Sequence, residues 1–177
     1  ELINLRDEIN TIQDLKDKSH KINEIEKKFT LFNCKIVNDL IKNIGLKPDL
    51  IGFHGQTIFH KVKDKISIQI GDGHLLSQMT RCPVINKFRQ KDLDNDGQGA
   101  PLTPIFHSLL SAKIHKKFNL KFPISVINIG GITNISSIVK HEKFDEDIFA
   151  FDIGPGNCMI DEWIRKNSDR KFDHDGK

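Results

Sequence analysis

One carboxylate stands beside a glycine turn in residues 151–157, which read FDIGPGN. The apolar run of residues 148–151 predicts a strand before the acid, and residues 159–165 read as a helix after the turn. Ligands of α/β proteins usually sit at strand ends, and glycine lets the backbone approach a bound group closely. The free N–H groups at the start of the following helix attract anions. The pattern predicts that Asp152 acts as a base beside a bound phosphate.

Three further clusters have a related character. Residues 126–135, VINIGGITNI, read as strand, glycine turn and strand. The glycine pair fits a tight hairpin with positive φ, and its free amides would hold phosphate oxygens. Residues 96–102, DGQGAPL, form a glycine loop before a predicted helix, and residues 51–57, IGFHGQT, end an apolar run with polar groups. We expect the four clusters to line one shared cleft.

Six short motifs follow one another from about residue 50 onward: FHGQT, SIQIGDG, FRxxD, GQGAPLxPxFH, NIGGITNIS and FDxGPGNxxxDxW. Each is weak alone, but in this order they resemble the anhydro-N-acetylmuramic acid kinases. Residues 172–176, FDHDG, also fit, whereas the region before residue 50 matches only as a helical connection. The resemblance implies an α/β fold with ribonuclease H-like (actin-like ATPase) lobes. Residues 1–120 would be a partial first lobe, and residues 121–177 the start of the second.

The resemblance also implies a reaction. Asp152 would activate a water that attacks the anomeric carbon of the 1,6-anhydro sugar. Ring opening would free O6, which takes the γ-phosphate of ATP, commonly with Mg²⁺, to give N-acetylmuramic acid 6-phosphate in cell-wall recycling. From the residues alone, an Asp152 that merely caps Gly154 or Asn157 is an equal alternative.

The resemblance assigns further residues to the site. The predicted substrate-binding residues are His54, Gln56, Thr57, Arg89, Lys91 and Gln98. The predicted phosphate- and nucleotide-binding residues are Asn128, Gly130, Gly131, Asn134, Gly154, Gly156 and Asn157. A cation at Arg89 or Lys91 would meet the lactyl carboxylate of the sugar, although a surface salt bridge is equally credible.

Other acids and histidines stay open. Asp161 fits a family position, but it is also a favourable charge near a helix N-terminus. Asp173 and Asp175 suit a metal, yet two acids beside a glycine are usually a loop. Zinc binding by His54 and His60 is disfavoured because no third ligand is obvious, so no metal ligand is assigned.

The chain departs from the family pattern at two positions. The family reads Asp-Phe-Arg where this chain has Lys87, and Gly-Gly-Gln-Gly where it has Asp96. Lysine reverses the charge and loses any ion pair that the acid made, so we expect Lys87→Asp to raise stability or activity. Aspartate would be strained at position 96 if the first glycine needs positive φ, although it tolerates that conformation better than most residues. Both changes suggest relaxed function.

Composition excludes several classes. A chain of 177 residues buries one core, or one domain and part of another. With a net charge of only +3, binding to nucleic acid would require a local basic patch. The lysines at 113, 116, 117 and 121 are instead interpreted as a solvated helix face. The sequence contains no run of about 18 apolar residues, so no membrane span is predicted, and no signal peptide is visible. Three widely spaced cysteines favour a reducing compartment, the cytoplasm, with Cys158 as a small buried residue rather than a reactive one.

The predicted elements begin with two helices in residues 1–45, with Ser19 as an N-cap and Gly45 as the stop. Coiled-coil pairing of this region is a rival interpretation. The expected apolar stripe is Ile22, Ile25, Phe29, Phe32, Ile36 and Leu40. Residues 50–53 and 84–88 are expected as strands, residues 57–62 and 66–70 as a hairpin, and residues 73–80 as a short helix.

The second half of the chain should start with a polar loop at residues 92–99. Residues 101–118 predict a helix with Pro104 in its first turn. Its expected apolar side is Phe106, Leu109, Leu110 and Ile114. A hairpin, a third strand and a helix should follow from about residue 125.

Both ends of the chain, Glu1 and Lys177, are expected to be cuts. The resemblance places the loop that holds ATP phosphates before residue 1, and the adenosine-side glycine motif and a second acid after residue 177. Activity of the chain alone is therefore not expected. Three hypotheses remain: a fragment of the sugar kinase, a non-catalytic remnant, and an actin-like structural module. The expected partners are the amino sugar, the missing segments as separate chains, and a second copy in a homodimer.

Overall fold

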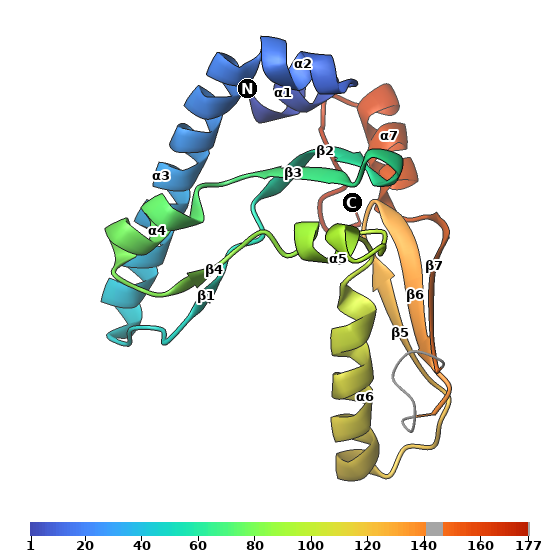
Figure 1. Ribbon diagram of the computed structural model, residues 1–177. Helices are drawn as coiled ribbons and strands as arrows, with labels where there is room; N and C mark the ends of the chain where they lie inside the picture. The colour runs from blue at the N-terminus through green and yellow to red at the C-terminus, as the bar shows by residue number, and fades with distance from the viewer. Residues whose placement is uncertain (141–146, 177) are drawn as a thin grey trace. The chain divides into compact units, whose positions relative to one another are not determined.

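The computed structural model describes residues 1–140 and 147–176, and its chain divides into two compact units (Figure 1). Unit 1 is Glu1–Ala100 and unit 2 is Pro101–Lys177. Both mix helices with strands, which confirms the α/β class. The units divide 20 residues before the predicted lobe boundary at residue 120, which stays a prediction about the family fold. Within the described residues, no helix is both long and apolar enough to cross a bilayer.

Unit 1 begins with three helices rather than the predicted two: α1 (Leu2–Asp7), α2 (Ile12–Asp17) and α3 (Ser19–Ile44). The missed break comes from Thr11, whose side chain caps α2 in a capping box with Asp14. Ser19 is not the N-cap of α3, because Lys18 occupies that position and no side chain caps the helix. Gly45, at φ 71°, ends α3 as predicted.

The predicted apolar stripe of α3 holds only in its first half. Ile25 is buried there, but Phe32, Ile36 and Leu40 are 62%, 48% and 54% exposed. The helix contacts two separate apolar clusters, and its second half packs through Cys34 instead. The buried face therefore differs between the two halves, which a single periodic pattern does not express.

The strands of unit 1 form two small sheets. β2 (Gln56–Lys61) and β3 (Ile66–Ile70) make the predicted antiparallel hairpin, joined through the 3₁₀ turn Val62–Asp64. Helices α1, α2 and α3 pack on it through a core built on Leu5, Ile9, Ile25, Ile58, Phe59 and Ile70.

The second small sheet has one strand before this hairpin and one after it, and two helices also follow the hairpin. β1 (Ile51–Gly52) pairs in parallel with β4 (Val84–Ile85), and both are shorter than predicted. Helix α4 (Gly73–Thr80) has its predicted bounds. The expected loop at residues 92–99 is wrong at its start, because α5 (Gln90–Asp94) is helical there.

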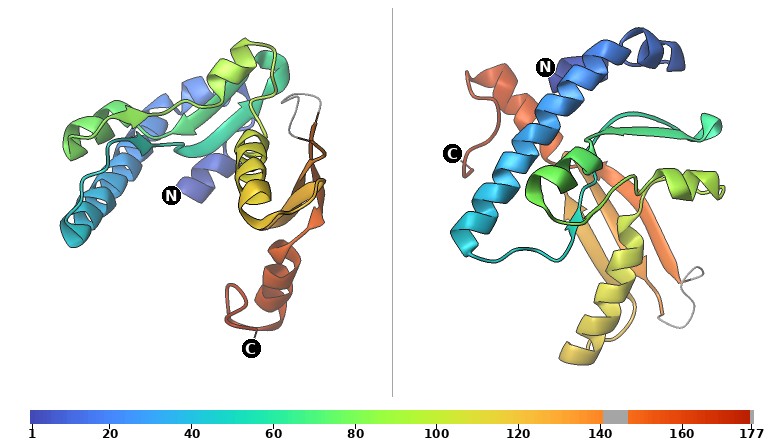
Figure 2. Two further views of the ribbon diagram at one scale, coloured as in Figure 1. Left: turned by 90° about the horizontal axis from the view of Figure 1, so that it is seen from below. Right: turned by 60° about the vertical axis from the view of Figure 1, so that its left-hand side comes forward.

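Unit 2 consists of one sheet and two helices. Helix α6 (Thr103–Phe118) is followed by strands β5 (Ile124–Ile129), β6 (Ile132–Ile138) and β7 (Ile148–Pro155), and by helix α7 (Asn157–Asn167). The antiparallel order is β5-β6-β7, which confirms the predicted hairpin, third strand and helix. Helix α6 packs against β6 and β7 (Figure 2).

The predicted apolar side of α6 is wrong at Phe106, Leu109 and Leu110, which are exposed, whereas Ile114 is half-buried. Phe106 and Leu109 are 63% and 53% exposed, whereas Ser108 and Ser111 are buried. The small residues allow the helix to approach the sheet closely, and His107 bonds the Ser136 hydroxyl through Nδ1 at 2.9 Å. The sheet also exposes large apolar side chains, namely Ile127, Ile129, Phe149, Phe151 and Ile153.

Candidate functional site

Asp152 lies in line with two asparagines across the sheet of unit 2. The register pairs Asn128 with Asn134 and Asn134 with Asp152. Directly paired residues of neighbouring strands point to the same face of a sheet, so Asn134 on the central strand stands between Asn128 and Asp152, next to the point where the β6–β7 register shifts. The structure thus brings the predicted catalytic acid beside one predicted phosphate-binding residue, Asn134, with Asn128 one strand further on.

The carboxylate of Asp152 is exposed and has no hydrogen bond or ion pair within residues 1–140 and 147–176. Gly156 is the N-cap of α7, and no side chain caps that helix. The alternative in which Asp152 merely caps Gly154 or Asn157 is therefore wrong. Asp152 also lies inside β7 rather than at its end, because extended backbone continues to Pro155. A carboxylate with free oxygens can accept a proton from a bound group.

The glycine turn before β6 holds the start of α7. The amides of Gly156 and Asn157 donate to the carbonyls of Gly131 at 2.9 Å and Gly130 at 2.7 Å, and the amide of Cys158 donates to Gly131 at 3.3 Å. These three amides already have acceptors, so the predicted cradle of free amides does not exist at them. The expected positive φ of Gly130 and Gly131 is also wrong. The turn instead presents carbonyl oxygens to the helix.

Gly156 has a steric reason to be glycine. A Cβ added there would overlap the carbonyl oxygen of Gly130 and lie 2.9 Å from Oγ1 of Thr133. A Cβ added at Gly154 would meet nothing within 4 Å. Of the two glycines in this motif, only Gly156 is required for the close approach between helix and turn.

The rest of this region offers side-chain amides. In the described part of the chain, the side-chain amides of Asn128, Asn134 and Asn157 have no hydrogen-bond partner, so they remain available to a ligand. Asp161 accepts the amide of Asp173 at 3.4 Å and lines a pocket of about 390 Å³. That contact favours a structural role in holding the loop after α7.

The cysteines are all free thiols in the structure. Cys34 and Cys82 are buried, and burial raises the pKa of the Cys34 thiol. Cys158 is exposed, so the expectation of a small buried residue is wrong at this position. No group of three metal-ligating side chains occurs among the residues that the structure describes.

In unit 1, His54 and Arg89 form one hydrogen-bonded group. His54 Nδ1 lies 2.8 Å from the carbonyl oxygen of Gly55, so Nδ1 must carry the proton. Nε2 then accepts from Arg89 Nε at 2.9 Å, and Arg89 Nη1 donates to the carbonyl of Gly99 at 2.8 Å. Arg89 thereby links two predicted motifs and fixes the ring of His54.

The other predicted substrate residues are less closely grouped. Gln56 donates to the carbonyl of Thr57 at 3.3 Å, and the Thr57 hydroxyl accepts from Gln69 at 3.3 Å. Lys91 and Gln98 are exposed. None of these four lines the pocket of unit 1 that Phe53 and His54 help to form. Since each unit is described by itself, the single cleft expected from the sequence stays a prediction.

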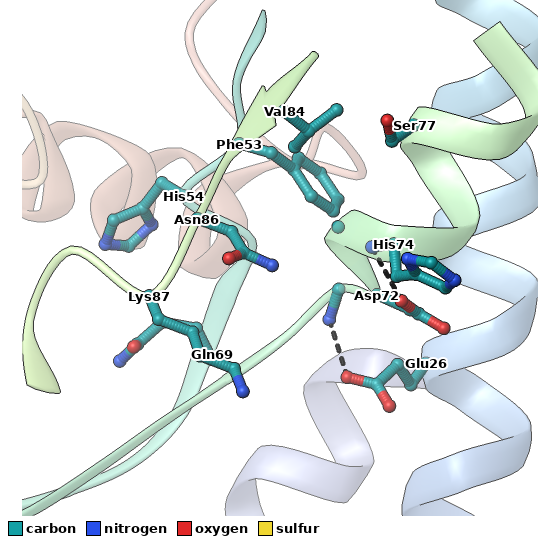
Figure 3. A pocket seen from close by; sticks show the side chains of 12 residues that line it. Glu26, Phe53, His54, Gln69, Asp72, His74, Ser77, Val84, Asn86 and Lys87 are labelled. Carbon is teal, nitrogen blue, oxygen red and sulfur yellow. Dashed lines mark hydrogen bonds between the residues drawn. The ribbon is translucent and has the colours of Figure 1, made fainter. Parts of the chain in front are cut away.

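That pocket has a volume of about 530 Å³, enough for a small ligand (Figure 3). Its lining residues are Glu26, Phe53, His54, Gln69, Gly71, Asp72, Gly73, His74, Ser77, Val84, Asn86 and Lys87. Asp72 caps α4 by accepting the amides of His74 at 2.9 Å and Leu75 at 3.0 Å.

Sequence reasoning missed most of this pocket. Glu26, on α3, accepts the amide of Gly71 at 2.9 Å, although α3 lies outside every motif. Nothing in the sequence around Glu26 could have identified it. For Asp72 a signal existed, because an aspartate directly before a helix predicts an N-cap.

The two positions at which the resemblance predicts a different residue both lie on left-handed backbone. Lys87 has φ 57° and Asp96 has φ 65°. Asp96 pairs with Lys65 at 2.6 Å, and this contact holds the pKa of the Asp96 carboxyl below its usual range. Aspartate tolerates this conformation several-fold better than lysine, so the strain expected at Asp96 is present but modest.

Comparisons with known proteins identify the class to which this α/β chain belongs. The sequence profile of "Anhydro-N-acetylmuramic acid kinase" matches residues 3–177. A protein of that name from Pelagibacter ubique is 53% identical over 99% of this chain and 45% of its own length. Relatives of the same name from Brucella canis and Methylobacterium nodulans are 38% and 39% identical over 93% and 90% of the chain.

The chain therefore belongs to the anhydro-N-acetylmuramic acid kinase family. It spans less than half the length of these relatives, between 41% and 45%.

Proposed function

We propose that the complete protein is an ATP-dependent kinase that opens 1,6-anhydro-N-acetylmuramic acid with water and phosphorylates it at O6. The observation that carries the proposal is the free carboxylate of Asp152, held in register with Asn134 and Asn128. A general base needs a positioned acceptor, and β-sheet pairing positions this one. The fold would be the ribonuclease H-like pair of lobes, in cell-wall recycling in the cytoplasm.

The pocket of unit 1 supports the sugar side of this proposal. It is lined by neutral and charged hydrogen-bonding groups together with Phe53, as a hydroxylated ligand requires. Arg89 would act by fixing His54 at the pocket edge rather than by touching the sugar. Gln56, Thr57, Lys91 and Gln98 would contribute only at the edge of a larger site.

On the phosphate-binding side of the site, side-chain groups are better placed than backbone amides to bind a phosphate. The backbone amides of Gly156, Asn157 and Cys158 already donate to the turn before β6. The side-chain amides of Asn128, Asn134 and Asn157 would therefore donate to the phosphate oxygens. ATP would supply the transferred phosphoryl group. Mg²⁺ usually keeps several waters and takes few protein carboxylates, so it would be held mainly by the phosphates.

We further propose that the chain alone does not turn over and needs the segments that its relatives have in addition, within one protein or as separate chains. A homodimer is a further proposal. Neither nucleic acid nor membrane is proposed as a partner.

A chimera tests the proposed function. Residues 3–177 replace the matching segment of the Pelagibacter ubique relative, and phosphate transfer to the anhydro sugar is measured. We expect turnover in the chimera, loss of turnover in Asp152→Asn, and retained sugar binding in that variant. Asp169→Asn, an exposed acid outside the site, is the matched control. Turnover near the parental rate in Asp152→Asn would remove Asp152 from the mechanism.

A further inference from the structure

The pocket of unit 1 has oppositely charged walls. Glu26 and Asp72 lie on one side, whereas Lys87 lies on the other, near His54 and Asn86 (Figure 3). Lys87 is exposed, and its ammonium has no hydrogen bond or ion pair with the described residues. It is a free cation at the edge of a pocket of about 530 Å³.

The acidic wall is fixed by the backbone. One oxygen of Glu26 accepts the amide of Gly71 at 2.9 Å, and one oxygen of Asp72 accepts the amides of His74 and Leu75. Each carboxylate keeps a second oxygen for a ligand. Carboxylate oxygens accept strongly from hydroxyl groups, so this wall suits the hydroxyls of a sugar.

Lys87 lies on left-handed backbone, as Lys65 and Arg81 do. Its φ of 57° is unfavourable for lysine, whereas aspartate and asparagine adopt it several-fold more often. Arg89, the other cation nearby, uses Nε and Nη1 to hold His54 and Gly99, so it is less free to bind a ligand.

We propose that Lys87 is a specificity-determining residue that recognises a carboxylate on the sugar bound in this pocket, an inference that rests on the proposed function. The ligand's hydroxyl groups face Glu26 and Asp72, and its acidic substituent faces Lys87. A neutral sugar leaves the ammonium without a counter-charge. The pocket therefore selects an acidic amino sugar and orients it by charge.

The test compares two probes, 1,6-anhydro-N-acetylmuramic acid and 1,6-anhydro-N-acetylglucosamine, which differ by the lactyl ether. Binding to the 177-residue chain is measured by calorimetry. We expect the acid to bind about tenfold more tightly, a difference of about 1.4 kcal/mol. Lys87→Met should abolish this preference and Lys87→Arg should keep it, with neutral-sugar affinity equal in all three proteins.

Three outcomes distinguish a failure of the inference about Lys87 from a failure of the proposed function. A preference for the acid that disappears in Lys87→Met and weakens at high salt supports the inference. An unchanged preference in Lys87→Met overturns it and leaves the proposed function standing. Failure of both probes to bind any of the proteins overturns the sugar-binding role of this chain together with the inference. Equal binding of the neutral probe shows that the variants are folded.

Discussion

Replacing Gly156 by alanine should detach helix α7 from the turn that Gly130 and Gly131 form before β6. The added Cβ would overlap the carbonyl oxygen of Gly130 and press on Oγ1 of Thr133 at 2.9 Å. Both are parts of the β5–β6 hairpin, and a backbone carbonyl cannot move away without shifting the strand. Either the helix or the turn must move, and the hydrogen bonds between them are lost.

The magnitude follows from those bonds. The amides of Gly156, Asn157 and Cys158 all donate to the turn, and the third bond is long at 3.3 Å. At about 1 kcal/mol for each bond, the loss is roughly 2–3 kcal/mol. With a urea dependence of about 1–3 kcal/mol per molar, the unfolding midpoint should fall by roughly 1–3 M.

The assay uses Trp163, the single tryptophan of the chain, which lies in α7. Its fluorescence during urea titration reports the docking of that helix. Gly154→Ala is the matched control, because its Cβ would meet nothing within 4 Å, and its midpoint should stay near that of the parent. Equal midpoints for the Gly156 and Gly154 variants would refute the steric argument.

Two further predictions concern the left-handed residues. Lys87→Asn should raise stability by about 0.5–1 kcal/mol, because asparagine tolerates φ 57° better than lysine, and Lys87→Asp should do the same; a lower melting temperature for both would contradict this. Asp96→Asn keeps the backbone preference but removes the ion pair with Lys65. Since the pKa of Asp96 is lowered from 3.8 in the folded chain, its stabilising effect is present above that pH and is lost as the pH falls below it. The melting temperatures of parent and variant should therefore differ at pH 6 and converge towards pH 2–3, and a gap that does not change with pH would exclude the ion pair as its source.

The elements of the chain could be predicted where local signals were strong. The hairpin on either side of Lys63 to Lys65, the helix at residues 73–80 and the stop at Gly45 follow from alternation, periodicity and glycine. Burial was harder to predict. Helix α6 turns Ser108 and Ser111 to the sheet rather than Phe106, because close packing decided the face and average hydrophobicity did not.

The candidate site shows the same division. Sequence motifs identified Asp152, Asn128 and Asn134, and strand register brings them together. The motifs suggested free amides at the start of α7, but the turn's carbonyls accept from them. Glu26 could not be found at all, since its role depends on where α3 passes the loop before α4. Contacts between segments distant in sequence leave no local pattern.

The two departures from the family pattern have different physical consequences, which bears on whether the chain is a remnant. At position 96, where the resemblance predicts glycine, aspartate tolerates the left-handed backbone and its carboxylate pairs with Lys65. At position 87, lysine is unfavourable on the same kind of backbone and has no partner in the described chain. A drifting remnant should accumulate uncompensated strain at both positions. Compensation at one position, together with a free cation at the edge of a polar pocket at the other, argues instead for an altered pocket.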